Sequence, residues 1–229
     1  MRNLIAVFIL AILFICCGCG GNRADSVDFP MKPQRDIYVV DAAHMLDEDS
    51  RNQILYYGAE LDKKYKAQVV VVTVDSLQGL NIEEYATTLF RTWGIGDKEK
   101  NNGVLLLISK NDRKFRIEVG YGLEGILPDA KCNIILSGMR GNFQKKNFSK
   151  GIEDAYIDIM DQIYKGYGDE GGANDKASKL DIGILLLLFG IVGLFSFSLA
   201  TGNQFIGSSD KFNGFGGGSS GGGGASGGW

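Results

Sequence analysis

Histidine and proline are scarce in this chain. Among 229 residues there are three prolines and one histidine, His44. A Ser-His-Asp or Cys-His catalytic arrangement would have to use that single histidine, and no nucleophile-elbow motif lies near it. The sequence therefore argues against nucleophilic catalysis of the common kinds and leaves the catalytic residues, if any exist, unassigned.

A basic excess is also missing, and cysteine is sparse. The net charge is -3, so the chain lacks the electrostatic footprint of a nucleic-acid-binding protein. Of the four cysteines, Cys16, Cys17 and Cys19 stand together and Cys132 stands alone. This spacing is neither a disulfide framework nor a metal-binding pattern.

The cysteine cluster belongs to an N-terminal segment typical of export signals. A short positive start precedes an apolar stretch at residues 4–15, and Gly18 stands before Cys19. The pattern predicts a signal peptide of the lipoprotein type at residues 1–19, with Cys19 lipidated. Cys16 replaces the usual Leu or Val of a lipobox, so ordinary cleavage or an uncleaved anchor are the alternatives. Each of these predicts that the domain after the signal is exported.

A second apolar run, at residues 182–200, has bilayer length. It is apolar on every face, which disfavours a buried core helix. We therefore expect a transmembrane helix at 181–201, between a linker at 168–180 and a flexible Gly/Ser-rich tail at 202–229. Because the signal exports the domain, this single crossing would place the tail in the cytoplasm and the domain outside the cell membrane.

Between a linker at 20–35 and the second linker, residues 36–167 read as one domain with interleaved strands and helices. Asp47 can cap a helix, and Asn81 with Glu84 resembles a capping box that opens a helix ending at Trp93. Apolar strands are expected at 68–75 and 104–109, a more alternating strand at 115–119, and helices after Pro128 and at 151–164. The order predicts a three-layer α/β/α sandwich with a central mixed sheet.

Acidic residues recur at the predicted ends of these strands, and ligands of open α/β sheets collect at strand ends. Several carboxylates without a histidine favour a hard cation, Ca²⁺ or Mg²⁺. The alternative is that each one is a helix cap or a surface charge. The candidate metal ligands are Asp41, Asp97, Glu118, Glu124 and Asp129.

Two glycine-rich loops fail as known ligand motifs. The loop at 94–103 lacks the Walker Gly-Lys-Ser/Thr end, and as a calcium loop it has its glycine one position late and Ile108 where Glu is needed. The stretch EVGYGLEG contains Gly-x-Gly-x-x-Gly, but Pro128 follows in place of a helix that opens at the third glycine. Neither loop predicts a nucleotide as ligand.

Taken together, the strings WGIGDKEKNNGVLLLIS and RIEVGYGLEGILPDA resemble the TPM domain family, and the similarity extends over residues 37–166. The resemblance implies an α/β/α fold and an exported domain tethered to the membrane. Family members include thylakoid-lumen and photosystem II repair proteins, and divalent-metal binding and phosphatase activity are attributed to some. The chain departs from the family pattern at residues 141–143, where a proline is expected before Phe143, and at Phe148, where Tyr is more usual.

Two functions are compatible with this resemblance. The first is an interaction or quality-control module for membrane protein complexes, with a divalent cation in an acidic cleft. The second is a metal-dependent phosphatase acting on phosphomonoesters, in which the carboxylates hold a cation that activates water. The second lacks an obvious clamp for phosphoryl oxygens, because Lys98, Lys100 and Arg113 are the only basic residues near the predicted cleft.

Overall fold

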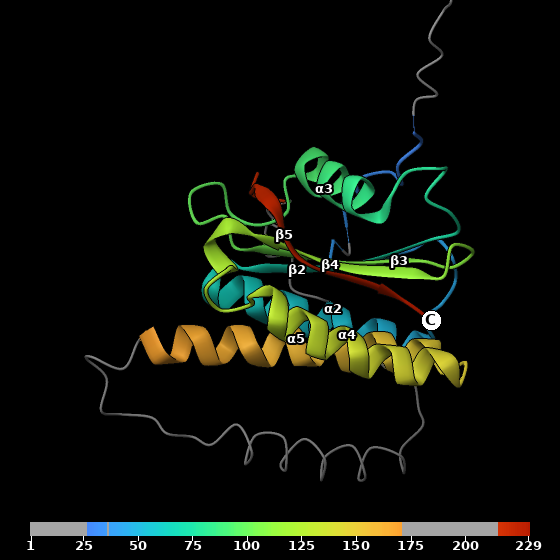
Figure 1. Ribbon diagram of the computed structural model, residues 1–229. Coiled ribbons are helices and arrows are strands. Elements are labelled where there is room, and N and C mark those ends of the chain that lie inside the picture. Colours follow the sequence, from blue (N-terminus) through green and yellow to red (C-terminus); the bar gives the residue numbers. More distant parts are fainter. Residues whose placement is uncertain (1–26, 36, 171–214) are drawn as a thin grey trace, which may run out of the picture.

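A computed structural model describes residues 27–35, 37–170 and 215–229, which form a five-stranded mixed sheet with helices on both faces (Figure 1). The elements in chain order are β1 (Val39–Asp41), α2 (Glu48–Tyr65), β2 (Gln68–Val74), α3 (Ile82–Trp93), β3 (Gly103–Ser109), β4 (Lys114–Gly120), the 3₁₀ turn η1 (Tyr121–Leu123), α4 (Asp129–Gln144), α5 (Phe148–Glu170) and β5 (Ser220–Gly228). The predicted signal peptide, Cys19 and the apolar run at 182–200 lie outside the described residues.

No helix within the described ranges is both long and apolar enough to cross a bilayer. The transmembrane helix expected at 181–201 therefore stays a prediction from the sequence.

The sheet has the spatial order β1-β2-β3-β4-β5. The first three strands run parallel, with Val39 opposite Val71 and Val71 opposite Leu106, and β4 runs antiparallel to β3. Every residue of β2 and β3 is buried, as expected for strands covered on both faces. The apolar runs at 68–75 and 104–109 are thus confirmed as central strands.

The helices form two unequal layers (Figure 1). On one face α3 packs its Tyr85, Leu89 and Trp93 against alternate residues of β2 and β3, such as Val70 and Leu105. The remaining helices, α2, α4 and α5, cover the other face, where the intervening strand residues point. The alternation follows from the two-residue period of a strand, and it confirms the α/β architecture with helices on both sides.

Two predicted helix starts are confirmed by their hydrogen bonds. The Asp47 carboxylate accepts from the backbone N–H of Ser50 at 2.8 Å at the start of α2. Asn81 Oδ1 accepts from the N–H of Glu84 at 2.6 Å at the start of α3. Each bond satisfies a donor that the first helical turn would otherwise leave unpaired. The last helix begins at Phe148, three residues earlier than expected.

For residues 215–229 the structure corrects the expectation of a flexible tail, whereas residues 202–214 lie outside the described part of the chain. Residues 220–228 form β5, which pairs antiparallel with β4 from Lys114 opposite Gly228 to Gly120 opposite Ser220. The expectation rested on how little apolar surface glycine and serine can bury. It neglected that a sheet edge offers a row of backbone donors and acceptors that glycine can satisfy as well as any residue.

Candidate functional site

The candidate site is the edge of the sheet where the C-terminal residues lie. We call residues 215–229 the tail segment, and residues 27–35 and 37–170 the body. The tail segment contacts the body along its whole length, from Asp97, which forms a β-bridge with Gly217, to the far end of β4, where Lys114 faces Gly228. Its composition is almost pure glycine and serine, with one aromatic residue at each end.

Both aromatic ends fit against aromatic side chains of the body. Phe215 stacks on Trp93 with 5.7 Å between ring centroids. Trp229 stacks on Phe115 at 5.7 Å and meets Phe143 edge-on at 4.6 Å. Aromatic pairs in these geometries each contribute about 0.5–1.5 kcal/mol beyond the area they bury. The tail segment is therefore fastened at two points, with the glycine strand held between them.

The socket around Trp229 includes Phe148, at which a Tyr is expected from the sequence resemblance, and Phe143. Phe143 belongs to α4, and Phe148, at the start of α5, lies with its ring centroid 6.2 Å from that of Trp229. The adjoining Arg140 donates from Nε to the Gly228 carbonyl at 2.8 Å. These residues form the wall against which the last residue of the chain packs.

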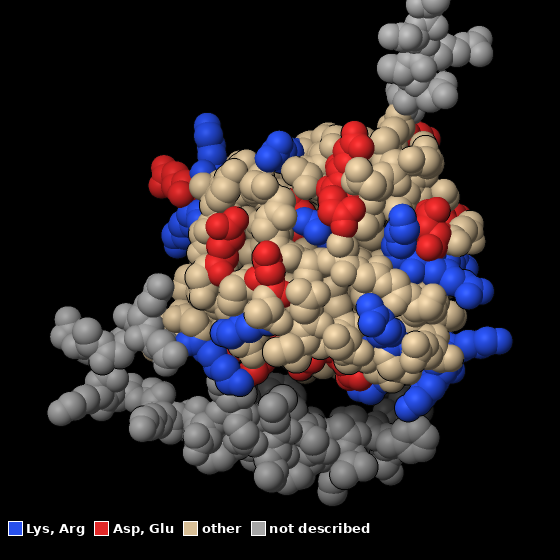
Figure 2. Space-filling view, in the orientation of Figure 1, with Lys and Arg blue, Asp and Glu red and all other residues tan. Residues whose placement is uncertain are grey.

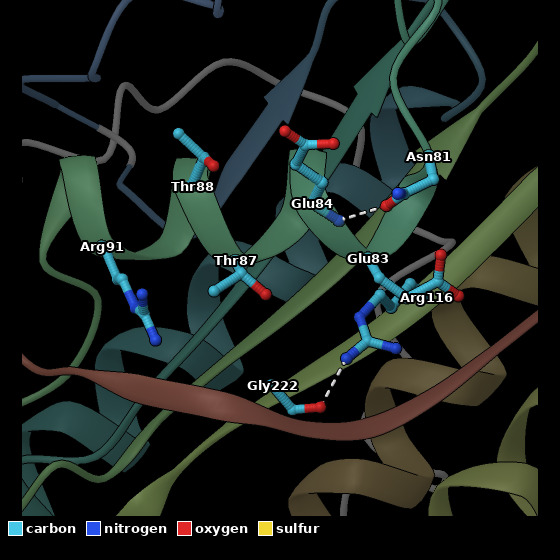
Figure 3. A pocket seen from close by; sticks show the side chains of 8 residues that line it. All are labelled: Asn81, Glu83, Glu84, Thr87, Thr88, Arg91, Arg116 and Gly222. Atoms are coloured by element: carbon cyan, nitrogen blue, oxygen red, sulfur yellow. Dashed lines mark hydrogen bonds between the residues drawn. The ribbon is translucent and has the colours of Figure 1, made fainter.

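Two arginines bind the backbone of the tail segment. Arg91, on α3, donates from Nε and Nη2 to the Ser220 carbonyl at 3.0 and 2.8 Å. Arg116, on β4, donates from Nη2 to the Gly222 carbonyl at 2.7 Å. Figure 3 shows Arg91 reaching from its helix and Arg116 from its strand toward the ribbon of β5. Bonds to a charged donor are the stronger kind, so these two contacts hold the strand firmly.

Glu118 completes this arrangement beneath the tail segment. Its carboxylate is fully buried and forms an ion pair with Arg116, with 2.7 Å between Nη2 and Oε2. The other carboxylate oxygen accepts from Thr87 Oγ1 at 3.0 Å and from the hydroxyl of Ser220. Burying a charge is costly unless it is paired and hydrogen-bonded, and here both oxygens have partners.

Three further predicted ligands also lie beside the tail segment. Asp129, in the first turn of α4, accepts from the Gly224 N–H at 2.9 Å. Glu124 lies so close that a Cβ on Gly223 would stand 2.9 Å from its Oε1. Asp97 accepts from the N–H groups of Glu99 and Lys100, both at 2.9 Å, and these bonds lower the pKa of its carboxyl.

Asp41 lies elsewhere. It ends β1 at the carboxyl ends of the parallel strands, whereas Asp97 precedes β3 and Glu118 pairs with Leu105 near the amino end of that strand. The Asp41 carboxylate accepts from the N–H groups of Met45 and Leu46 at 2.9 and 3.0 Å and from the Thr73 hydroxyl. The structure therefore brings four of the five carboxylates to the tail segment and uses the fifth to close a turn.

The positions of the five predicted carboxylates do not fit a preformed cation site. Among the residues that the structure describes, no three Asp, Glu, His or Cys side chains are grouped to hold a metal ion. Glu118 is satisfied by Arg116, Thr87 and Ser220, and Asp41 by two backbone N–H groups and a hydroxyl. Protein donors therefore occupy both carboxylate oxygens of Glu118 and of Asp41, two of the five residues that the sequence assigns to Ca²⁺ or Mg²⁺.

A hollow of about 510 Å³ lies between α3 and the last two strands (Figure 3). Acidic and basic groups share its wall: Glu83 and Glu84 stand with Arg91 and Arg116. The pKa of Glu83 is lowered, chiefly because its carboxylate accepts a hydrogen bond from Ser226 of the tail segment. On the face in Figure 2, acidic and basic side chains are likewise interspersed, so that face has no broad field of one sign to steer a ligand.

The isolated cysteine gives no support to a nucleophilic site. Cys132 is buried on α4, and burial, reinforced by the nearby Asp129 charge, raises the pKa of its thiol to about 12. A thiol must lose its proton to act as a nucleophile, so this one is inert at ordinary pH.

Sequence reasoning missed the two arginines, Ser220 and Trp229. One signal could have revealed Arg116. It stands two residues from Glu118, so the two opposite charges share one face of a strand whose other face is apolar, as an ion pair would. No comparable signal marks Arg91, which looks like an ordinary basic residue in the last turn of a helix.

The fold and this edge define a class: an α/β domain whose mixed sheet is completed by a strand from the chain's own C-terminus. The model of the TPM domain matches residues 39–162, more than half of the chain. The protein belongs to the TPM domain family, as the sequence resemblance predicted.

One relative and two solved structures that this chain resembles each share less than 30% of aligned residues with it. UPF0603 protein YdjH of Bacillus subtilis (strain 168) is 23% identical over 169 residues, which cover 74% of this chain and 61% of that protein. The solution structure of the N-terminal domain of a protein from P. gingivalis is 28% identical with a TM-score of 0.53, and covers 56% of this chain and 83% of that domain. BA42 from Bizionia argentinensis is 18% identical with a TM-score of 0.46, over 52% of this chain and 82% of BA42.

Proposed function

We propose that this TPM domain is an interaction module that binds an extended polypeptide segment by adding it as a strand to the edge of β4. The observation that carries the proposal is the tail segment itself. It is an extended, nearly side-chain-free peptide, and the body binds it through the β4 ladder, two arginines and Asp129.

Strand addition is a recurring mode of peptide recognition, in which backbone bonds give affinity and pockets for side chains give specificity. Both parts are present here. The backbone bonds come from β4 and its flanking charged residues, and the pocket is the aromatic socket that holds Trp229. The carboxylates near the edge serve to hold and orient such a segment.

The setting of this module is proposed from the sequence. The export signal predicted at residues 1–19 and the apolar run at 182–200 support a domain outside the cytoplasm and tethered to the membrane. A module in that position, with an edge that accepts extended backbone, suits partners among membrane protein complexes, whose connecting loops and termini offer such segments.

Phosphatase activity is the second candidate, and one observation favours it. Arg91 and Arg116 lie beside the same hollow, and guanidinium groups bind phosphate well. Both guanidiniums are, however, already bonded to carbonyls of the tail segment, and the described residues bring no three Asp, Glu, His or Cys side chains together to hold a metal ion. We therefore rank hydrolysis below binding.

The binding proposal is tested with a fluorescent peptide of residues 215–229. The receptor is the full-length protein in detergent, with Trp229→Ala and Gly224→Ala to release its own tail. Gly224 has φ +126°, and a Cβ there would stand 1.9 Å from the Ile117 carbonyl oxygen. We expect saturable binding by fluorescence anisotropy.

Two altered peptides serve as controls. The Gly224→Ala peptide should bind at least about tenfold more weakly, which corresponds to 1.4 kcal/mol. The Gly223→Ala peptide should bind almost normally, because its new Cβ meets only the flexible end of the Glu124 side chain. If a folded receptor binds no peptide, or binds all three equally, the β4 edge is not a recognition site.

The cation and the phosphatase are tested together. We expect no saturable heat when Ca²⁺ or Mg²⁺ is titrated into the full-length protein. In the described residues no three possible ligands are grouped, and Glu118 and Asp41 already accept from protein donors. Hydrolysis of a phosphomonoester should not exceed that of the Asp97→Ala, Asp129→Ala variant. Saturable cation binding that this variant loses, together with turnover, would favour the phosphatase instead.

A further inference from the structure

Some residues of the tail segment are buried inside the molecule, and others are exposed on its surface. Ser220 is fully buried with its hydroxyl on Glu118, and Ala225 is 6% exposed within the core on the α4 side. Without the tail segment, the Arg116–Glu118 ion pair would lose its cover and the Arg91 guanidinium its two bonds to Ser220. The body and the tail segment are therefore built as complementary parts.

The glycines of the tail segment show the same complementarity. A Cβ at Gly218 would stand 2.3 Å from the Ile95 carbonyl oxygen, closer than real Cβ atoms come to backbone. At Gly224 the positive φ adds backbone strain for any other residue. A flexible linker needs glycine at no particular position, whereas this segment needs it where the body approaches most closely.

The pairing has a consequence for how the chain lies relative to a membrane. The apolar run at 182–200 stands between α5 and the tail segment in the sequence. If it crossed a bilayer once, the two would lie on opposite sides. Strands β4 and β5 share a hydrogen-bond ladder, so they must lie in the same compartment when paired.

We infer that the tail segment is a resident ligand of the β4 edge and stays on the same side of the membrane as the TPM domain. The inference uses the same strand pairing as the proposed function but not the existence of any outside partner. It replaces the expectation of a cytoplasmic tail opposite an exported domain.

Cysteine labelling of the full-length protein in intact cells tests the compartment. Ser226→Cys probes the tail segment and Lys114→Cys probes the body; both residues are exposed, and the unaltered chain gives the background from its own cysteines. We expect a membrane-impermeant maleimide to label both variants under the same condition, before or after permeabilisation. Labelling of Ser226→Cys only on the side opposite to Lys114→Cys would overturn the inference.

A crosslinking arm tests the docking. Lys114 faces Gly228, so cysteines at 114 and 226 should be diagonal neighbours, about 7–8 Å apart, and a short bis-maleimide should join them. The matched control joins Lys114→Cys with Ser219→Cys, which lies beside Tyr121, seven residues or roughly 23 Å along β4 from Lys114. Crosslinking of the first pair alone supports docking, whereas equal crosslinking or none from either pair contradicts it.

The two proposals can fail separately. A tail segment found on the opposite side would overturn the shared compartment, and the peptide titration would still decide whether the β4 edge binds an extended segment. Failure of the peptide to bind a folded receptor would remove the recognition site without altering which side the tail segment occupies.

Discussion

Replacing Arg116 with methionine is expected to lower the free energy of unfolding by about 3–5 kcal/mol, the usual cost of removing one partner of a buried ion pair. The Glu118 carboxylate is completely buried and would remain without its charged partner. The change also removes the bond from Arg116 to the Gly222 carbonyl. Urea unfolding of the full-length protein, followed by far-UV circular dichroism, measures the loss.

The matched control is the double variant Arg116→Met, Glu118→Leu. Apolar side chains of similar volume can replace a buried ion pair at little net cost, so this variant should regain at least half of the lost stability. If Arg116→Met alone changes stability by less than about 1 kcal/mol, the pair is not buried as described. If the double variant is no more stable than the single one, repacking rather than an unpaired charge explains the loss.

Trp229→Ala is expected to release the C-terminal end of β5 and to lower stability by about 2 kcal/mol. Truncating a fully buried Trp costs about 3–5 kcal/mol, and this residue is only partly buried against Phe115 and Phe143. Hydrogen exchange with mass spectrometry should show faster exchange in residues 220–228. The central strands should keep their protection.

Trp229→Phe provides the comparison, because it keeps an aromatic ring in the socket. It should retain most of the protection of β5 and at least half of the stability that Trp229→Ala loses. Unchanged exchange in both variants would show that the backbone ladder alone holds the tail segment. Loss of protection throughout the sheet would show that the strand cannot leave without unfolding the body.

Much of the body could be predicted from local patterns. The caps at Asp47 and Asn81 and the apolar strands at 68–74 and 103–109 depend on neighbouring residues, so the sequence displays them directly. The fifth strand depends on contacts between residues about a hundred positions apart, such as Arg116 with Gly222. A glycine-rich stretch has no hydrophobic period, so nothing local announced that it would pair.

The candidate site was predicted in part for the same reason. Carboxylates near the ends of recognised strands were found, and four of them do gather at one end of the sheet. The sequence alone does not give the direction of the strands in the sheet, so it groups Asp41 with the other four, whereas Asp97 precedes its strand and Asp41 is the last residue of another. The contacts of these four carboxylates with residues 215–229 could not be predicted, because the sequence does not indicate that β5 forms.

Because β5 lies far from β4 in the sequence, the ribosome makes it well after the other four strands of the sheet. Roughly 110 residues separate the end of β4 from Trp229, and at about 5–20 residues per second a ribosome needs on the order of 5 to 20 s to make them. Throughout that interval the nascent sheet has an open edge, the kind of surface that chaperones and aggregation partners engage. Trp229, which fills the aromatic socket, is translated after every residue of this sheet. The sheet can therefore close only after translation has passed these residues, and a product truncated before Ser220 would keep the open β4 edge.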